Sequence, residues 1–499
     1  MAATIIRGGR VLDLERRSAQ TADVLIDGGT IREIGRDLVF PEGAAVIDGR
    51  DRLLVPGLVN AHTHAHGALG KGMVPDRAPL EVWLAWSGAA LGPRGAEEKY
   101  LSAQLSAIEM VHKGCTAAYD MCVEYPAPTV DGVRAVAQAY ADVGMRAVVA
   151  PMMADRTLWQ ALPGLLDAVP EPMRADVDKL RTAPYEASVA ASREILRTWP
   201  FDRARVRPGL GPTIPLHCSD EFLTACRDLA REFDVGLQMH LAETRSQALL
   251  GRQKYGRTLT AHLESLGLLG PRFSGAHGVW LERDEIRRLA DAGAAIAHNP
   301  LSNLRLGSGI APVRLMRALG LRVGIGTDST STSDTQNMFE AMRMATYLTR
   351  VQGEPPEQWL GSDETLAMAT TGSAGVLGMA DRIGRLTPGH AADIVFLDLT
   401  FIGYVPLNDA LLQLVCAESG AAVEKVMIDG RLVMSDRKLL TVDEEKVRHN
   451  AEAAAERLRA HTAPGVAAAR AVERYVSGFC VGLLREPYPI ERFTRLGSE

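Results

Sequence analysis

The sequence predicts an α/β protein: a (β/α)8 barrel of the TIM type, with a small composite β-sandwich built from both ends of the chain. Two observations predict this fold. Short apolar segments alternate with helical patterns through the middle of the 499-residue chain, which is typical of a parallel sheet wrapped by helices. Strand-rich stretches with glycine-containing turns flank this middle on both sides.

The first element is a group of short strands in residues 1–58, where β-branched runs are separated by glycine-rich turns. Residues 383–442 have the same character, and Asp429-Gly430 is a strong signal for a two-residue hairpin turn. We expect these two segments to pair into one composite β-sandwich domain.

Residues 59–382 are predicted to form the barrel. Helical patterns such as 96–113 and 220–233 separate its candidate strands. A doubly wound open sheet is the alternative, but no GxGxxG motif opens a helix after a strand, so the barrel is favoured. The candidate strands are 58–62, 115–120, 145–150, 205–211, 235–240, 273–277, 294–298 and 322–327.

Residues 443–499 are predicted to form a helical C-terminal extension. Its helical pattern is expected to break at Pro464-Gly465, because proline removes a backbone donor, then to resume and end in a proline-rich stretch. We expect a packing or subunit-contact role for this extension, in a homodimer or larger homo-oligomer.

Composition narrows the partners and the compartment. The 55 basic and 61 acidic residues give a net charge of −6 without a basic run, so nucleic acid is not an expected partner. The six cysteines form no CxxC pair, which favours a reducing compartment. Arg7 and Arg10 interrupt the apolar stretch that a signal peptide needs, and no run of 18 apolar residues predicts a membrane span. We therefore expect a cytoplasmic protein.

Histidines and one aspartate fall at the ends of predicted strands. His62 and His64 end the first strand, and two residues of separation place both imidazoles on one side of it. His240 ends the fifth strand, His277 the sixth, and Asp328 follows the eighth. Barrel enzymes place their chemistry at these carboxyl ends, so the pattern predicts an active site there.

Several segments carry a family resemblance: PGLVNAHTH at 56–64, MHLAET at 239–244, AHG at 276–278, HNPLSNLRLGSGIAPV at 298–313 and GIGTDS at 324–329. In this order and spacing they resemble the amidohydrolase superfamily. The similar branch holds S-adenosylhomocysteine and related aminopurine deaminases, guanine deaminases and triazine chlorohydrolases. The resemblance extends to about residue 440, where PGHAADIVFLD and VMIDGRLVM are similar to the segments that build this family's sandwich.

The resemblance implies one divalent metal ion held by His62, His64, His240 and Asp328. Such a set leaves a position open for water, as a catalytic metal requires. Binuclear relatives carry a carboxylated lysine on the fourth strand, and the corresponding stretch RVRPGLGP has no lysine, so a single ion is expected. Zinc is favoured over iron, although nitrogen and oxygen ligands suit both.

The resemblance also implies three catalytic residues. Glu243 lies three residues after His240 and would carry a proton from water to the substrate. Without the neighbouring histidine, Glu243 would be interpreted as a solvent-exposed residue at the start of a helix. His277 would form a hydrogen bond to the attacking hydroxide or to the tetrahedral adduct. Asp328 would accept the water proton as well as bind the metal.

Some further polar and aromatic residues are candidate substrate contacts. Trp83 could stack on a planar ring, and packing against apolar neighbours is an equal alternative for it. His66 and His298 are expected to be structural. The candidates are Trp83, Thr213, His217 and Asn303.

The implied reaction is hydrolytic deamination of an aminated N-heterocycle. Relatives that act on adenosine compounds carry GPH on the fourth strand and a glutamate in the first loop. Thr213 and Leu91 stand at those positions here, which favours a guanine-, pterin-, pyrimidine- or triazine-like ring without ribose. Dechlorination or dealkylamination of a triazine-like ring and cyclic amide hydrolysis are the alternatives, because the pocket sets the leaving group. A non-catalytic scaffold is disfavoured because the ligands and Glu243 are all present.

Overall fold

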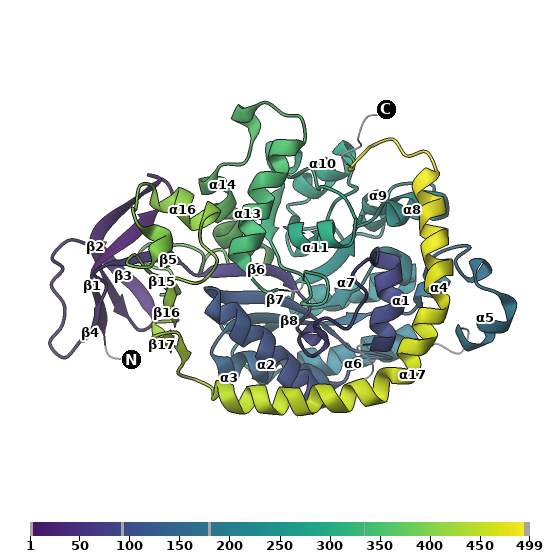
Figure 1. Cartoon of the computed structure of the whole chain (residues 1–499), viewed down its shortest axis with the longest axis horizontal. Coiled ribbons are helices and arrows are strands. Elements are labelled where there is room, and N and C mark those ends of the chain that lie inside the picture. The colour runs from purple at the N-terminus through teal and green to yellow at the C-terminus, as the bar shows by residue number, and fades with distance from the viewer. Residues whose placement is uncertain (1–2, 91–93, 178–180, 334, 494–499) are drawn as a thin grey trace.

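The computed structural model describes residues 3–90, 94–177, 181–333 and 335–493, and it shows a mixed α/β fold with parallel sheets (Figure 1). The parallel strands lie in the middle of the molecule with helices around them. A separate, mixed sheet stands at one end, on the left in Figure 1.

All eight predicted strands of the middle region are present. Nearly every residue in them is buried, so most of them are largely apolar, and their polar residues, such as Gln238 and His240 of β11, are buried as well. The fourth is divided into two short pieces, β9 and β10. The strands are β6 (Leu58–Thr63), β7 (Cys115–Val123), β8 (Arg146–Met153), β9 (Val206–Pro208), β10 (Gly211–Pro212), β11 (Leu237–Leu241), β12 (Phe273–His277), β13 (Ala295–His298) and β14 (Arg322–Ile325).

These strands form two parallel sheets. One has the order β10-β8-β7-β6, with β9 also paired to β8, and the other has the order β11-β12-β13-β14. Hydrogen bonds join the two sheets on both sides. The backbone N–H of Gln238 donates to the Leu210 carbonyl at 3.0 Å, and that of Asp328 donates to the His62 carbonyl at 3.0 Å. The carboxyl ends of β6, β11, β12 and β14 therefore lie close together.

The two ends of the chain meet in one nine-stranded sheet. The strand β5 pairs antiparallel with β15, which brings the N-terminal and C-terminal segments into a single hydrogen-bonded layer. The hairpin at Asp429-Gly430 joins β16 and β17, and both turn residues have positive φ, as a tight I′-type turn requires. The strands are β1 (Thr4–Asp13), β2 (Ser18–Asp27), β3 (Thr30–Gly35), β4 (Ala45–Asp48), β5 (Arg52–Pro56), β15 (Ile394–Asp398), β16 (Val423–Ile428), β17 (Arg431–Ser435) and β18 (Lys438–Leu439).

Helices cover the parallel sheets, and polar caps fix where several of them begin. Ser219, for example, accepts a hydrogen bond from the Phe222 N–H at the start of α7. The longer helices are α1 (Leu80–Ala90), α2 (Ala96–His112), α3 (Val130–Val143), α6 (Tyr185–Arg197), α7 (Asp220–Phe233), α8 (Arg245–Tyr255), α10 (Arg283–Asp291) and α13 (Met338–Leu348). The shorter ones are α4 (Leu158–Ala161), α5 (Glu171–Val177), α9 (Leu259–Ser265), α11 (Pro300–Arg305), α12 (Val313–Ala318), α14 (Ser362–Ala367), α15 (Ser373–Val376) and α16 (Ala410–Cys416).

The expected break at Pro464-Gly465 is wrong, because α17 (Glu444–Arg485) continues through it. Figure 1 shows this helix running along the bottom of the molecule and then turning upwards. Proline removes one backbone hydrogen bond and so bends the helix, while packing on both sides preserves it. Buried residues such as Leu458 and Val472 lie before and after the bend, and Gly465 lies against Ala89 of α1.

Among the described residues, no helix is both long enough and apolar enough to cross a membrane.

Candidate active site

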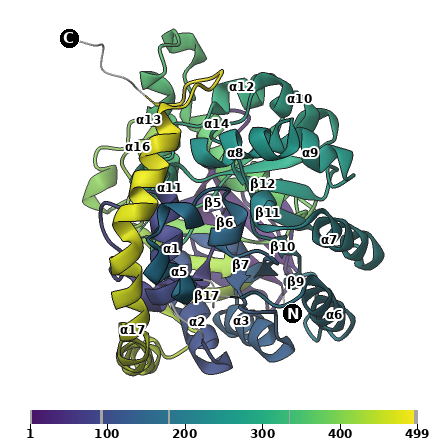
Figure 2. The ribbon, with the colours of Figure 1, turned by 90° about the vertical axis from the view of Figure 1, so that its right-hand side faces the viewer.

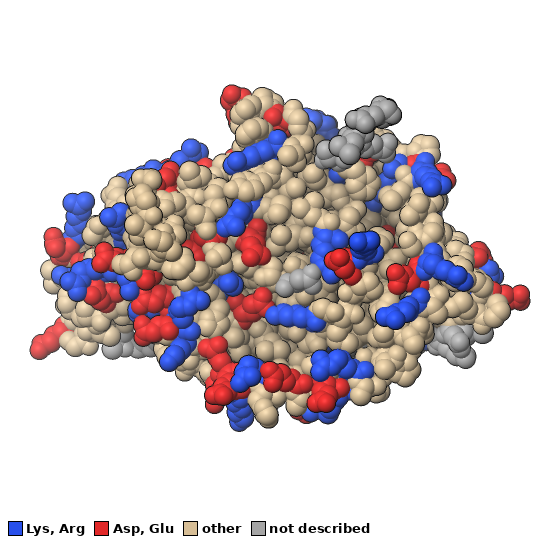
Figure 3. Space-filling model, viewed as in Figure 1, with Lys and Arg blue, Asp and Glu red and all other residues tan. Residues whose placement is uncertain are grey.

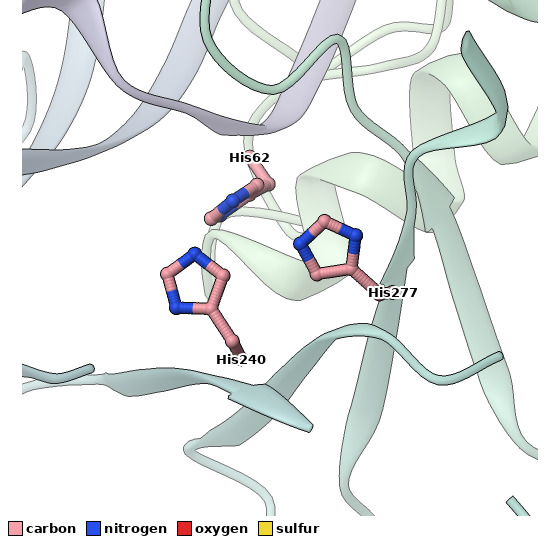
Figure 4. Close-up of side chains that lie close together, drawn as sticks. All are labelled: His62, His240 and His277. Carbon is pink, nitrogen blue, oxygen red and sulfur yellow. The ribbon is translucent and has the colours of Figure 1, made fainter. Parts of the chain in front are cut away.

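Side chains from four strands and the segments that follow them meet at the carboxyl ends of the parallel strands. His62, His240 and His277 come from β6, β11 and β12, and their rings point toward one another (Figure 4). All the predicted ligands are buried. Three groups have potential ligand atoms within 4.8 Å of one another: His62, His64 and Asp328; His62, His240 and His277; and Glu243, His277 and Asp328.

Each predicted histidine ligand is oriented by a hydrogen bond from its Nδ1–H. Because Nδ1 carries the proton, Nε2 of each ring presents its lone pair to the site, as a metal ligand must. The acceptors are Gln238 Oε1 for His62 at 2.8 Å, the Met121 carbonyl for His64 at 2.7 Å and the Thr213 carbonyl for His240 at 2.7 Å.

These atoms fit a bound cation. Nε2 of His64 and Nε2 of His240 lie 3.0 Å apart, and two lone pairs at that distance repel one another unless a cation lies between the rings. Nε2 of His62 is buried and has no hydrogen-bond partner among the described residues. Oδ1 of Asp328 lies 3.6 Å from His62 Nε2 and 3.4 Å from His64 Nε2. Three imidazole nitrogens and one carboxylate are the donor set of a catalytic zinc site.

The protonation state of the imidazoles also suits metal binding. Burial, with the nearby His62, lowers the pKa of His64 to about 4, and burial lowers the pKa of His240 well below its ordinary value. Both rings are therefore neutral at pH 7, which is the form that binds a metal ion.

Asp328 is held in place from two sides. Ser302 Oγ donates to its Oδ2 at 2.6 Å, and the Ser329 N–H donates to its Oδ1 at 2.7 Å. Asp328 has a φ of 62° and His277 a φ of 75°, a left-handed conformation that side chains other than glycine rarely adopt. Strained residues of this kind cluster at functional sites, where the surrounding structure holds them.

Glu243 lies beside this cluster in the loop between β11 and α8. Its carboxylate is 1% exposed, and its Oε2 lies 3.6 Å from His277 Nε2. Burial, followed by the negative charges of Asp328 and Glu81, raises the pKa of Glu243 well above its ordinary value. A carboxyl group of raised pKa can hold and release a proton near neutral pH, which is the property that a general acid needs.

His277 is positioned by Asn303. Its Nδ1–H donates to Asn303 Oδ1 at 2.9 Å, so its Nε2 is an acceptor that faces Glu243 and lies 4.0 Å from Asp328 Oδ2. Burial lowers the pKa of His277 to about 4, so this ring is also neutral at pH 7.

The four candidate substrate contacts occupy different positions. Thr213 uses its carbonyl to orient His240, and Asn303 contacts His277. The Trp83 indole N–H donates to the Ser331 carbonyl at 3.0 Å, which places α1 against the segment that follows Asp328. His217 is buried in a 3-10 turn (Pro215–His217) and belongs to none of the three ligand groups. Leu91 lies outside the described residues.

Two residues of this site were missed by the sequence analysis. Gln238 orients His62, and it precedes His240 by two residues on β11, so strand alternation could have placed it on the same face. Glu81 in α1 is buried and accepts a hydrogen bond from Thr244 Oγ1 at 2.8 Å. Nothing in the local sequence distinguishes Glu81 from a solvated helix residue.

Comparison with known proteins gives a family match and similar deaminases. Residues 53–433 match the family model described as "Amidohydrolase family". A 5-methylthioadenosine/S-adenosylhomocysteine deaminase of Desulforudis audaxviator is 36% identical over 446 residues, which cover 88% of this chain and 95% of that protein.

Two crystal structures resemble the fold closely. An adenosine deaminase from Xanthomonas campestris with bound zinc has a TM-score of 0.80 at 27% identity, covering 92% of this chain and 99% of that one. The atrazine chlorohydrolase of Arthrobacter aurescens TC1 in complex with zinc has a TM-score of 0.80 at 28% identity, covering 91% of this chain and 100% of that one.

Proposed function

Because this chain belongs to the amidohydrolase family, we propose that it is a metal-dependent hydrolase that releases ammonia from a small aminated N-heterocycle. The observation that carries this proposal is the convergence of three imidazole Nε2 atoms and the Asp328 carboxylate, with Glu243 beside them. The deaminase relatives support the choice of a C–N bond as the one that is broken.

One divalent ion would be held by His62, His64, His240 and Asp328. When bound, it supplies the Lewis acidity that makes water nucleophilic near neutral pH. The absence of lysine from the fourth-strand sequence 205–212 supports a single ion. The zinc in two similar structures supports zinc over iron.

The proposed roles of the catalytic residues follow from their contacts. Asp328, fixed by Ser302 and Ser329, would accept a proton from the attacking water and pass it to the departing amine. Glu243 would deliver a proton to the ring nitrogen next to the attacked carbon and would regain one from the hydroxyl group of the adduct as the amine departs. His277 would accept a hydrogen bond at Nε2 from the incoming oxygen, because Asn303 keeps its proton on Nδ1. Overall, water and the aminated ring give the hydroxylated ring and ammonia.

The proposed substrate is a guanine-, pterin-, pyrimidine- or triazine-like ring without ribose. Thr213 supports this choice, since it stands where adenosine-acting relatives have a histidine. The names of the relatives point instead to adenosine compounds, so these belong in any substrate panel. Dechlorination is the second candidate reaction, and it is favoured by the structural similarity to the atrazine chlorohydrolase. Loss of an alkylamine from the same ring, and cyclic amide hydrolysis, complete the alternatives.

The experiment is a product screen on the metal-replete protein. Ammonia, chloride and alkylamine release are measured for aminated purines, pterins, pyrimidines, triazines and adenosine compounds, with metal content determined by mass spectrometry. We expect ammonia release and one zinc ion per chain. Chloride or amine release without ammonia would establish the second candidate instead. Two metal ions per chain would favour cyclic amide hydrolysis.

We further propose the domain organisation. Residues 59–382 would close into a (β/α)8 barrel, which is supported by the hydrogen bonds that join the two parallel sheets. Residues 1–58 and 383–442 would form the composite sandwich, supported by the pairing of β5 with β15. Residues 443–499 would form the C-terminal extension.

A homodimer or larger assembly in the cytoplasm is also proposed. The assembly is supported by exposed apolar side chains near α16, a feature typical of interaction surfaces. The exposed apolar residues are Phe401, Ile402, Val405 and Leu412.

On the face shown in Figure 3, basic and acidic side chains are intermingled, which supports a small-molecule substrate over nucleic acid.

A further inference from the structure

The C-terminal segment, defined as residues 480–493, comprises the end of α17 and the chain after it, and it lies outside the matched family region 53–433. In Figure 2 the later part of α17, in yellow, runs up the left side of the view beside α1. The side chains of this segment contact the loops that carry the proposed catalytic residues.

The first contact involves the loop that carries Glu243. Arg245 follows Glu243 by two residues and is buried. Its guanidinium donates to the Leu484 carbonyl at 2.8 Å and also to the Glu486 carbonyl. The first residue of α8, directly after the loop that carries Glu243, is therefore hydrogen-bonded to the C-terminal segment.

The second contact involves the loop that follows β12 and His277. Arg492 donates from Nε to the Val279 carbonyl at 2.9 Å and from Nη2 to the Leu281 carbonyl at 2.8 Å. Between these two residues, the Trp280 ring lies edge-on to Phe493, with a centroid distance of 5.2 Å. One side chain thus fixes two carbonyls of this loop, on either side of Trp280.

The third contact involves the loop that follows Asn303. The Ile310 N–H donates to the Arg492 carbonyl at 2.8 Å. The neighbouring Gly309 has a φ of 116°, and a Cβ atom at this position would lie 2.9 Å from the Arg492 carbonyl oxygen. Only glycine leaves room for the C-terminal segment at this approach.

A fourth contact reaches the Glu243 loop through α1. Cys480 Sγ donates to Glu81 Oε2 at 3.6 Å, and the other oxygen of this buried carboxylate accepts from Thr244 Oγ1 at 2.8 Å. Thr244 is the residue directly after Glu243. The loop of the proposed proton carrier is therefore tied to the C-terminal segment at two points.

We propose that the C-terminal segment is a positioning element of the active site, with Arg492 as its central positioning residue. It fixes the relative positions of three segments that share no direct covalent restraint: the segment around Glu243, the loop directly after His277, and the loop that follows Asn303 and α11. Because these loops adjoin the buried site, loosening them is expected to make room for rings with bulkier substituents. This inference rests on the proposed function for its catalytic part.

The experiment compares Arg492→Ala and Gly309→Ala with Arg485→Ala, a matched control that removes an exposed arginine of the same segment. Hydrogen–deuterium exchange is measured for peptides covering 243–247, 278–282 and 306–311. Metal content and kinetics are measured on a free ring and on the same ring with an alkyl or ribosyl substituent. The ratio of kcat/KM for the two substrates does not depend on the fraction of folded enzyme.

We expect faster exchange in all three loops of Arg492→Ala and Gly309→Ala, with metal content unchanged. Displaced catalytic groups should lower kcat for the free ring about tenfold with little change in KM, since small misplacements are costly in rate. The kcat/KM ratio should shift about threefold or more toward the substituted ring. Arg492→Lys should recover part of the loss, because one carbonyl contact can be kept.

Exchange rates in Arg492→Ala that match those of Arg485→Ala would overturn the proposal. Faster exchange with unchanged kcat and substrate ratio would also overturn it, because the segment would then be a purely structural support. If the wild-type protein is inactive on every heterocycle, the proposed function fails separately, and the exchange of the three loops still supports or overturns the positioning of these loops.

Discussion

At the scale of single residues, the site depends on which nitrogen of each imidazole carries a proton. Gln238, the Met121 carbonyl and the Thr213 carbonyl each accept from an Nδ1–H, and this leaves the lone pairs of three Nε2 atoms converging. The Nε2 lone pairs of His64 and His240, 3.0 Å apart, would repel one another without a shared cation. Asn303 plays the same part for His277: its Oδ1 accepts from the Nδ1–H at 2.9 Å, while the Asn299 amide nitrogen lies farther away, 3.5 Å from Nε2.

The first prediction concerns Glu243. Glu243→Gln keeps the shape of the side chain but removes its titratable proton. The value of kcat should therefore fall about a hundredfold or more, while zinc content stays at the wild-type level. Steady-state kinetics and metal analysis on the same preparation provide the measurement. Glu285→Gln is the matched control, because Glu285 is an equally buried glutamate that caps α10, away from the histidines. A Glu243→Gln variant that keeps a tenth of the wild-type kcat would rule out the proton-carrier role.

At the scale of elements, strand ends and turns determine where the functional residues lie. The strands β6, β11 and β12 each end on or next to a histidine, so the parallel arrangement brings together residues more than 200 positions apart. The Asp429-Gly430 turn matters for a different reason: it anchors the nine-stranded sheet, and the Gly430 N–H donates to the Ala392 carbonyl at 3.1 Å.

The second prediction concerns this turn. Gly430 has a φ of 72°, and a Cβ atom there would lie 2.8 Å from Gly29 Cα. Gly430→Ala should therefore lower the free energy of unfolding by about 3 kcal/mol, from backbone strain and steric overlap together. Gly28→Ala is the control, since Gly28 also has a positive φ of 57° but nothing lies within 4 Å of its added Cβ, and it should cost only about 1 kcal/mol. Urea unfolding of both variants tests this, and equal losses would contradict the steric argument.

At the scale of the whole molecule, a buried ion network joins the nine-stranded sheet to the parallel strands. Arg146 of β8 pairs with Asp393 at 2.8 Å and with Asp429 at 2.9 Å, and Arg205 also pairs with Asp429 at 2.8 Å. Arg146 and Asp393 are almost fully buried, so each would be costly without its partner. This network fixes how the sheet from the chain ends meets the central strands.

The third prediction is a pH dependence. Burial would raise the pKa of Asp429, but hydrogen bonds and charge from Arg205 and Arg146 outweigh it and lower this pKa below its ordinary value of 3.8. The ion pairs therefore stabilise the fold above about pH 3.8, and this contribution is lost as pH falls through the lowered pKa. Asp429→Asn should cost about 1–2 kcal/mol at pH 7, and the difference from wild type should shrink on acidification.

Urea unfolding at pH 7, 5 and 3.5 measures this difference. Asp436→Asn, at an exposed aspartate of the same sheet, is the control and should show little effect at any pH. A difference for Asp429→Asn that grows as the pH falls would contradict the assigned direction.

The sequence alone predicted the eight central strands and placed His62, His240, His277 and Asp328 at or next to their carboxyl ends, while the metal-ligand set stays a prediction. These depend on local patterns: apolar runs long enough for a buried strand, and histidines placed where each run ends. Pro464 shows the limit of local reasoning, because its missing hydrogen bond predicts a break in a helix that tertiary packing keeps continuous.

The groups that orient the histidines and the contacts of the C-terminal segment could not be read from the sequence and are seen in the folded chain alone. The carbonyl of Met121 meets His64, Cys480 meets Glu81 across 399 positions, and Arg492 meets Val279 across 213. Such contacts leave no periodic signal in the sequence, because they arise from where separate elements end in space. The physical reason is that hydrogen bonds reach about 3 Å, and only the folded chain brings these atoms that close.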